Sequence, residues 1–145
     1  MSGANASPAG RSHKMNERSE CKPGSSHKMN ERKVMKKINI GVIGLGRLGS
    51  LYAGYLAGRV RGAELAAVAD SSEGVAVSIA DALGIECHYR HYQDLLAQKN
   101  IDAIVVTTPT STHKDVVVES AKCRKAIFCE KPLSLSLEEC EIMMK

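Results

Sequence analysis

A glycine-rich stretch, INIGVIGLGRLG, begins at Ile38 and contains the pattern G-x-G-x-x-G. The first glycine of such a pattern permits a tight turn, the second lets the backbone approach a pyrophosphate, and the third lets a helix pack closely on the preceding strand. Amide N–H groups in the first turn of that helix, together with its dipole, favour a bound phosphate. We therefore predict a dinucleotide-binding turn of six residues: Gly44, Leu45, Gly46, Arg47, Leu48 and Gly49.

A carboxylate follows this turn at a matching distance, because Asp70 lies 21 residues after Gly49. In dinucleotide-binding folds a carboxylate about 20 residues further on accepts hydrogen bonds from the adenosine ribose. It would also repel a 2′-phosphate, and residues 71–73 (SSE) contain no Lys or Arg to neutralise one. The sequence therefore favours NAD over NADP, and the alternative for Asp70 is a helix cap. For Arg47 we expect no role beyond a pyrophosphate contact.

Two later segments also carry residues that could reach a cofactor. The first, VVTTPTSTH at 105–113, leaves the end of a predicted strand, and sheets of parallel strands bind ligands at their carboxyl ends. Its hydroxyl groups could contact a cofactor or cap the next helix. The second, FCEKPL at 128–133, places a Glu and a Lys at the end of another predicted strand, where the alternative is a surface ion pair.

The elements that would position these residues alternate between strand and helix. β-Branched runs and helical spacing of apolar residues indicate this alternation. We expect strands at 38–43, 64–69, 101–107 and 125–129, with a weak one near 86–89. We expect helices at 48–56, 71–83, 92–96, 110–123 and 134–145, although three consecutive valines leave 110–123 ambiguous. This order predicts an α/β fold with a doubly wound parallel sheet, the Rossmann type.

Two details of these helices are open to a structural check. The first helix should bury one apolar face, made of Leu48, Leu51, Tyr52, Tyr55 and Leu56. The second helix should be capped by Ser71 or Ser72.

Composition narrows the classes of partner. Residues 1–37 contain nine Lys and Arg against three Glu, whereas residues 38–145 contain eleven against thirteen acidic residues. The basic excess therefore belongs to residues 1–35, which we interpret as a disordered leader, and no nucleic-acid partner is expected.

No apolar run approaches the ~20 residues of a membrane span, so no membrane partner and a cytoplasmic location are expected. The Cys and His residues lack zinc-ligand spacing, and we expect no metal.

Taken together, four segments resemble the glucose-fructose oxidoreductase, inositol dehydrogenase and rhizopine-catabolism (Gfo/Idh/MocA) family over about residues 36–145. They are the glycine pattern, Val-Ala-Asp at 68–70, Thr-Pro-Thr followed by His at 108–113, and Glu-Lys-Pro at 130–132. Within the family, the chain looks most similar to inositol 2-dehydrogenase and related sugar or cyclitol dehydrogenases in three segments: IGLGRLG, AELAAVAD and IFCEKPLSLSLEE.

The resemblance implies roles for the matching positions. Residues 44–49 would hold the pyrophosphate of NAD, and Asp70 would bind the adenosine ribose. Glu130 would bind the nicotinamide ribose, and Lys131 would contact the reacting substrate hydroxyl and assist proton transfer. A strained or cis bond to Pro132 would aim the Lys131 side chain. Three further residues would line the cofactor cleft: Thr108, Pro109 and His113.

The sequence departs from the family pattern in two ways. Arg124 stands where the family usually has Gly at the end of a helix, and a positive φ there would cost about 1 kcal/mol. The family also has a second α/β domain that binds substrate, and we expect the nucleotide domain at 36–145 to be incomplete at its C-terminus and truncated before that domain. Apolar surface should then be exposed.

Two functions remain open from the sequence. The first is an NAD-dependent dehydrogenase that oxidises a secondary alcohol of a cyclitol or sugar, inositol 2-dehydrogenase-like. Its partner would be a small polyol or sugar, and its full-length form is expected to be a homo-oligomer. The alternative is a truncated, non-catalytic dinucleotide-binding module.

Overall fold

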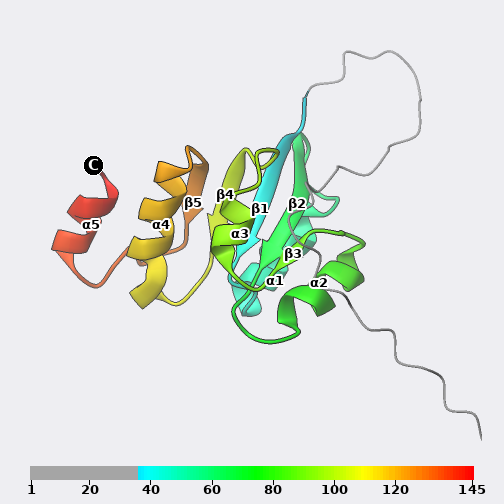
Figure 1. Ribbon diagram of the computed structural model, residues 1–145, viewed down its shortest axis with the longest axis horizontal. Helices are drawn as coiled ribbons and strands as arrows, with labels where there is room; N and C mark the ends of the chain where they lie inside the picture. Colours follow the sequence, from blue (N-terminus) through cyan, green and yellow to red (C-terminus); the bar gives the residue numbers. More distant parts are fainter. Residues whose placement is uncertain (1–35) are drawn as a thin grey trace, which may run out of the picture.

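The computed structural model describes residues 36–145; the expected leader at 1–35 lies outside the described residues. Strands and helices alternate in the predicted order (Figure 1). The elements are β1 (Ile38–Ile43), α1 (Arg47–Leu56), β2 (Ala63–Ala69), α2 (Val75–Leu83), β3 (His88–Tyr89), α3 (Tyr92–Leu96), β4 (Ala103–Val106), the 3-10 turn η1 (Thr110–Thr112), α4 (His113–Lys122), β5 (Ala126–Cys129) and α5 (Leu137–Met143). The ambiguous segment 110–123 is therefore a helix with a 3-10 start.

The strands form one sheet in the order β3-β2-β1-β4-β5, and every neighbouring pair is parallel. The predicted doubly wound α/β fold is confirmed. The chain moves outward from β1 to β3 and then returns to β4 on the other side of β1. In such sheets the ligand cleft lies at this reversal, outside the carboxyl ends of the strands.

The carboxyl ends of four strands are level with one another. Ile43 at the end of β1 pairs with both Ala69 of β2 and Val106 of β4. Val106 in turn pairs with Cys129 of β5. The residue that follows each strand therefore falls in one row along this edge: Gly44, Asp70, Thr107 and Glu130.

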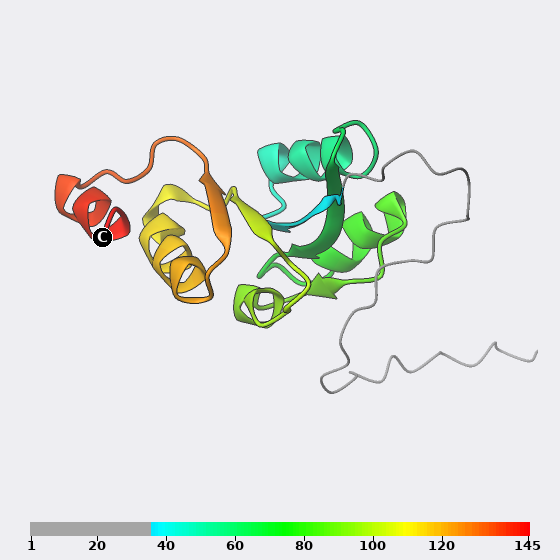
Figure 2. The same cartoon turned by 90° about the horizontal axis from the view of Figure 1, so that it is seen from above.

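Helices cover both faces of the sheet, as the view in Figure 2 shows. Successive strand residues point to opposite faces, so Val42 and Ile43 belong to different cores. On one face α1 and α2 pack through small residues such as Ala53 and Ala80. On the other face α3 and α4 contribute the core residues Leu95, Leu96 and Val116.

The predicted apolar face of α1 is partly wrong. Leu48, Leu51 and Tyr55 are each about half exposed. The buried face consists instead of Gly49, Ala53 and Leu56, and Tyr52 is half-buried. Small residues let the helix axis approach the sheet closely, and the larger side chains then point away from it.

The predicted cap of α2 is also wrong. The helix begins at Val75, and its N-cap is Gly74 with a φ of 76° and no side-chain hydrogen bond. Residues 71–74 instead form a turn in which the Ser72 N–H donates to the Asp70 carboxylate at 2.8 Å. Helix α5 likewise begins at Leu137, three residues later than predicted, and Ser136 caps it by accepting from the Glu139 N–H.

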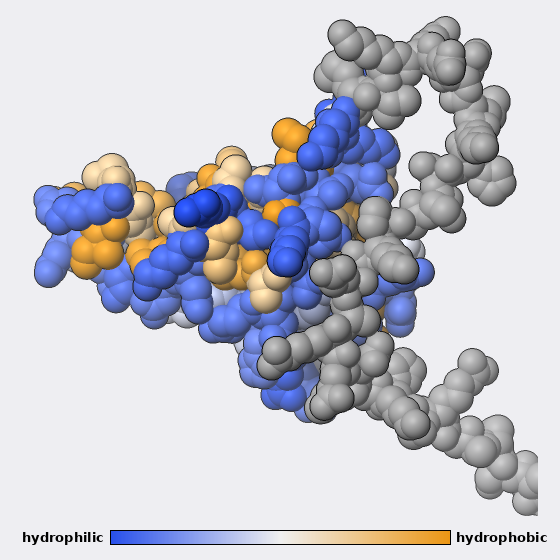
Figure 3. Space-filling view, turned by 45° about the horizontal axis from the view of Figure 1, so that its top comes forward, coloured by the Kyte–Doolittle hydropathy of each residue, from blue (hydrophilic) through white to orange (hydrophobic). Residues whose placement is uncertain are grey.

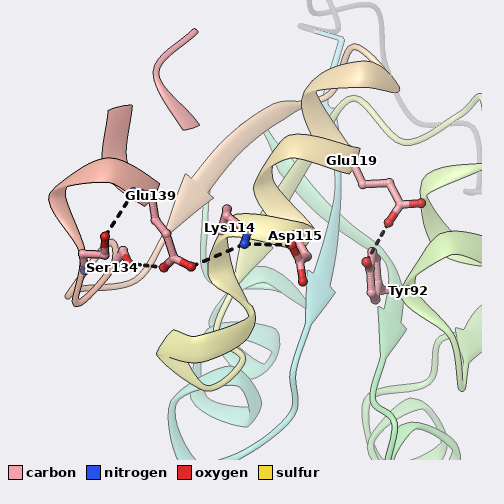
Figure 4. A network of polar contacts seen from close by, with 7 residues as sticks. Tyr92, Lys114, Asp115, Glu119, Ser134 and Glu139 are labelled. Atoms are coloured by element: carbon pink, nitrogen blue, oxygen red, sulfur yellow. Dashed lines mark hydrogen bonds and ion pairs between the residues drawn. The ribbon is translucent and has the colours of Figure 1, made fainter. Parts of the chain in front are cut away.

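Polar contacts connect α4 to both of its neighbouring helices (Figure 4). The Tyr92 hydroxyl of α3 donates to Glu119 at 2.6 Å, and burial with this hydrogen bond raises the pKa of Tyr92 to about 12. On the α5 side, Lys114 Nζ lies 3.4 Å from a Glu139 oxygen, and the Ser134 hydroxyl donates to the same carboxylate. Helix α5 therefore lies beside α4, at the end of the molecule.

Apolar surface is exposed toward the α5 end (Figure 3). Leu135 and Leu137 are 88% and 84% exposed, and Met144 is also exposed. The expected exposure of apolar surface is thus present. No helix in residues 36–145 has the length and hydropathy needed to cross a membrane.

Candidate dinucleotide-binding site

The glycine turn is shaped by its contact with the end of β4. Gly44 has a φ of 88°, and a Cβ on it would lie 2.7 Å from the Thr108 backbone nitrogen. A Cβ on Gly49 would lie only 1.8 Å from the Gly44 carbonyl oxygen. Gly46 differs, because nothing lies within 4 Å of its Cβ position. The outer two glycines are therefore required by packing, and the middle one leaves open space beside the backbone.

The start of α1 presents unsatisfied backbone donors to that space. Gly46 is the N-cap residue, and no side chain caps the helix. The first helical hydrogen bond runs from the Ser50 N–H to the Gly46 oxygen at 3.0 Å. The N–H groups of residues 47–49 precede it and have no intrahelical acceptor. This geometry fits an anionic group such as a pyrophosphate.

Asp70 is in direct contact with the glycine turn. Its Oδ2 accepts the Leu45 N–H at 2.6 Å, and its Oδ1 accepts the Ser72 N–H at 2.8 Å. It does not cap α2, which begins five residues later. A carboxylate offers about four acceptor positions, so two remain for ribose hydroxyls. Asp70 thus shapes the turn and retains the capacity that the sequence predicts for it.

Two threonines after β4 lie beside the same turn. The Thr107 hydroxyl contacts the Gly44 and Ile43 carbonyl oxygens at 2.6 and 3.1 Å. The Thr108 hydroxyl is buried, and among residues 36–145 it is the only buried side-chain oxygen or nitrogen found without a hydrogen-bond partner. Such an orphan group costs about 1–3 kcal/mol, which a ligand group could recover. Pro109 is exposed and is the N-cap of η1.

His113 lies beneath the loops that follow β4 and β5 rather than on their surface, where the resemblance would place a residue that lines a cofactor cleft. It is 1% exposed, and its Nε2 lies 2.8 Å from the Thr108 carbonyl oxygen. Its Nδ1 lies 3.1 and 3.3 Å from the carbonyl oxygens of Pro132 and Leu133. The ring therefore connects the loop after β4 with the loop after β5.

Glu130 and Lys131 follow β5. A Glu130 oxygen accepts the Tyr52 hydroxyl of α1 at 2.5 Å, and the other accepts the Lys131 N–H at 2.9 Å. The Tyr52 hydrogen bond, followed by the Lys131 backbone bond, lowers the pKa of Glu130. The Lys131 side chain is exposed, and the bond to Pro132 is cis, one of the two geometries the sequence suggested.

Most of the predicted site residues therefore converge at one edge of the sheet. The glycine turn, Asp70, Thr108 and Glu130 follow strands whose carboxyl ends are level. Sequence reasoning included Thr107 only as one hydroxyl of the segment 105–113, and it did not show the contact with the glycine turn. It missed Tyr52 altogether, because only the packing of distant segments reveals its contact with Glu130. In the described part of the chain, no three His, Cys, Asp or Glu side chains are grouped to hold a metal ion.

A parallel sheet with an open glycine turn and a carboxylate beside it, at the reversal of strand order, defines an α/β dinucleotide-binding protein. The chain belongs to the oxidoreductase family with an NAD-binding Rossmann fold, Gfo/Idh/MocA, whose family model matches residues 38–145. The family resemblance is confirmed, and so is NAD as the cofactor of this type of domain.

Individual relatives agree with this assignment. The chain is 45% identical over 103 residues to scyllo-inositol 2-dehydrogenase (NAD(+)) of Bacillus subtilis, covering 71% of this chain and 30% of that protein. It is 39% identical over 108 residues to myo-inositol 2-dehydrogenase of Thermotoga maritima, covering 74% and 32%. The crystal structure of scyllo-inositol dehydrogenase from Lactobacillus casei with NAD(H) and scyllo-inositol matches with a TM-score of 0.71 at 30% identity, covering 74% and 32%.

The chain spans about a third of the length of these relatives. The comparisons establish the family and the fold of the matched residues.

Proposed function

We propose that residues 36–145 form the nucleotide-binding domain of an NAD-dependent oxidoreductase that oxidises a secondary alcohol of a cyclitol or sugar, inositol 2-dehydrogenase-like. The observation that carries the proposal is the level row at the carboxyl edge of the sheet, where Gly44, Asp70 and Glu130 each follow a strand. Relatives named as inositol dehydrogenases support the substrate class.

The adenosine half of NAD would lie over β1 and β2. The N–H groups at the start of α1 would bind the pyrophosphate in the open space beside Gly46. Asp70 would accept the hydroxyls of the adenosine ribose with the oxygen positions left over from its two backbone bonds. The same negative charge would disfavour a 2′-phosphate.

The nicotinamide half would lie over β4 and β5. The unpaired Thr108 hydroxyl would gain a partner, and the Glu130 carboxylate would accept the nicotinamide ribose hydroxyls. Bound NAD supplies the hydride acceptor of the reaction. Lys131, exposed next to Glu130, would contact the substrate hydroxyl and help to move its proton.

A second candidate function is a dinucleotide-binding module without catalysis of its own. It is favoured by the small number of groups suited to substrate chemistry, because within residues 36–145 we assign substrate contact to Lys131 alone. Residues 38–145 contain thirteen acidic against eleven basic residues, so their net charge does not favour a nucleic acid as a partner in either candidate function. The cytoplasmic location and the homo-oligomeric state stay predictions.

One pair of measurements separates the two candidates. The purified chain is titrated with NAD by calorimetry and assayed for NADH formation from myo-inositol. Turnover supports the dehydrogenase for this chain, whereas binding without turnover supports the module. Failure to bind NAD at millimolar concentration would contradict both.

The cofactor assignment is tested with Asp70→Ala. We expect the affinity for NAD to fall about tenfold or more, because a carboxylate that binds two hydroxyls and orders the turn is lost. The preference for NAD over NADP should narrow as the negative charge disappears. Asp81→Ala, on the exposed side of α2, is the matched control and should change neither value. Tighter binding of NADP than of NAD by the unmodified chain would refute the assignment.

A further inference from the structure

We propose that Tyr52 of α1 is a positioning residue that holds the Glu130 carboxylate in the orientation that receives the ribose on the nicotinamide side of the cofactor. The proposal rests on the proposed function of Glu130. No motif in the sequence points to Tyr52, which lies 78 residues from its partner.

Two hydrogen bonds fix the Glu130 carboxylate. Its Oε1 accepts the Tyr52 hydroxyl at 2.5 Å, and its Oε2 accepts the Lys131 N–H at 2.9 Å. Without these bonds, a half-buried Glu side chain samples several rotamers, and binding a ligand would then cost the conformational entropy of fixing one of them. With one bond on each oxygen, the remaining acceptor positions have a defined direction before the cofactor arrives.

Tyr52 is itself held in place. Its ring packs edge-on against Phe128 of β5, with centroids 5.7 Å apart and planes at 63°. The position of α1 is set by the close approach of Gly49 to the Gly44 carbonyl oxygen. Tyr52 therefore joins the helix that follows the glycine turn to the end of β5, the two parts of the chain that would hold opposite halves of the cofactor.

The electrostatic surroundings of Tyr52 and Glu130 favour a neutral phenol that donates to an ionised carboxylate. The Tyr52 hydrogen bond lowers the pKa of Glu130, and the charge of Lys131 acts in the same direction. Glu130 in turn raises the pKa of Tyr52, so the phenol keeps the proton that it donates. Glu130 is thus held in the ionised form, which accepts hydrogen bonds from ribose hydroxyls and donates none.

The test uses Tyr52→Phe, which removes the hydroxyl and retains the ring that contacts Phe128. Calorimetry on the whole chain should show an affinity for NAD about three- to tenfold weaker, the effect of one hydrogen bond to a charged group at a partly solvated site. The affinity for AMP should be unchanged, because AMP contains only the adenosine ribose that we assign to Asp70. The matched control is Tyr55→Phe, one turn along α1, where the ring instead contacts Arg59.

The pH dependence of NAD binding gives a second test, because a purely structural role of Tyr52 would leave the acid midpoint unchanged. NAD binding through Glu130 needs the carboxylate, so it is present above the pKa of Glu130 and lost as the pH falls through it. Removing the Tyr52 hydroxyl removes the main cause of the lowered pKa. The acid midpoint of NAD binding should therefore move to higher pH in Tyr52→Phe and stay in place in Tyr55→Phe.

The possible results separate the inference from the function on which it rests. If the unmodified chain binds no NAD, both are overturned. If NAD binds but the two Tyr→Phe variants behave alike, the positioning role is overturned and the proposed function stands. An equal loss of NAD and AMP affinity in Tyr52→Phe would also overturn it, because that pattern indicates damage to the fold.

Discussion

The two halves of the candidate site are built by different means. Around the glycine turn, backbone atoms pack so closely that side chains are excluded, as at Gly49. Around the loops after β4 and β5, side chains make the connections: His113 contacts three backbone carbonyl oxygens, and Tyr52 contacts Glu130. The glycine turn therefore requires that side chains be absent, whereas the loops after β4 and β5 require the side chains that connect them.

This difference affects how each half should respond to mutation. Where backbone fits against backbone, adding one methyl group is the damaging change, because the interior has no room to relax. Where a buried ring lies against several carbonyl oxygens, removing atoms is the damaging change, because it leaves a cavity and removes the N–H that the ring donates. Two substitutions, Gly49→Ala and His113→Ala, test this contrast. A third, Arg124→Gly, tests backbone strain at the end of a helix, and the three follow in order of expected effect.

The largest effect is expected for Gly49→Ala. Its Cβ would lie 1.8 Å from the Gly44 oxygen and 2.7 Å from the Thr107 hydroxyl, so the turn or the helix must shift. We expect a loss of more than about 3 kcal/mol in the free energy of unfolding, or failure to fold. Gly54→Ala in the same helix has open space and should instead stabilise by about 0.5–1 kcal/mol. Denaturant unfolding measures both, and equal behaviour would contradict the packing account.

His113→Ala should have the next largest effect. The substitution empties a fully buried position and leaves the carbonyl groups of the two loops without their partner. We expect a loss of about 2–4 kcal/mol in the free energy of unfolding. His91→Ala, at an exposed N-cap position with no side-chain bond, is the control and should change it little. Equal melting temperatures for the two variants would show that His113 does not connect the loops.

The smallest effect, a gain in stability, is expected for Arg124→Gly. Helices α2 and α4 end in the same way: a residue with positive φ, Gly84 at 69° and Arg124 at 57°, is followed by a hydrogen bond that reaches back five residues. Arg adopts this conformation at a cost that Gly avoids. Arg124→Gly should therefore raise the free energy of unfolding by about 1 kcal/mol, measured by urea titration. Arg124→Ala keeps the strain and should show no such gain; a gain of equal size in both would refute the explanation.

Prediction from sequence worked best where structure is local. The strand and helix order, the parallel sheet and the glycine turn all follow from patterns within a few residues of one another. The face of α1 was mispredicted because apolar spacing favours large side chains, whereas small residues decided which side could approach the sheet. The start of α2 was mispredicted because Asp70 recruits the Ser72 N–H and extends the turn to Gly74.

The sequence by itself determined the class of site. Glycines at 44, 46 and 49 with a carboxylate at Asp70 constrain backbone conformation and charge over short distances, and such constraints can be read along one segment. Only the tertiary structure decided that His113 is buried beneath the loops after β4 and β5 and that Tyr52 contacts Glu130. The contact of His113 with Pro132 and that of Tyr52 with Glu130 join residues 19 and 78 positions apart, and their geometry depends on strand register and on the distance between a helix and the sheet. A sequence pattern does not encode these quantities locally, because they are set by the packing of all the elements together.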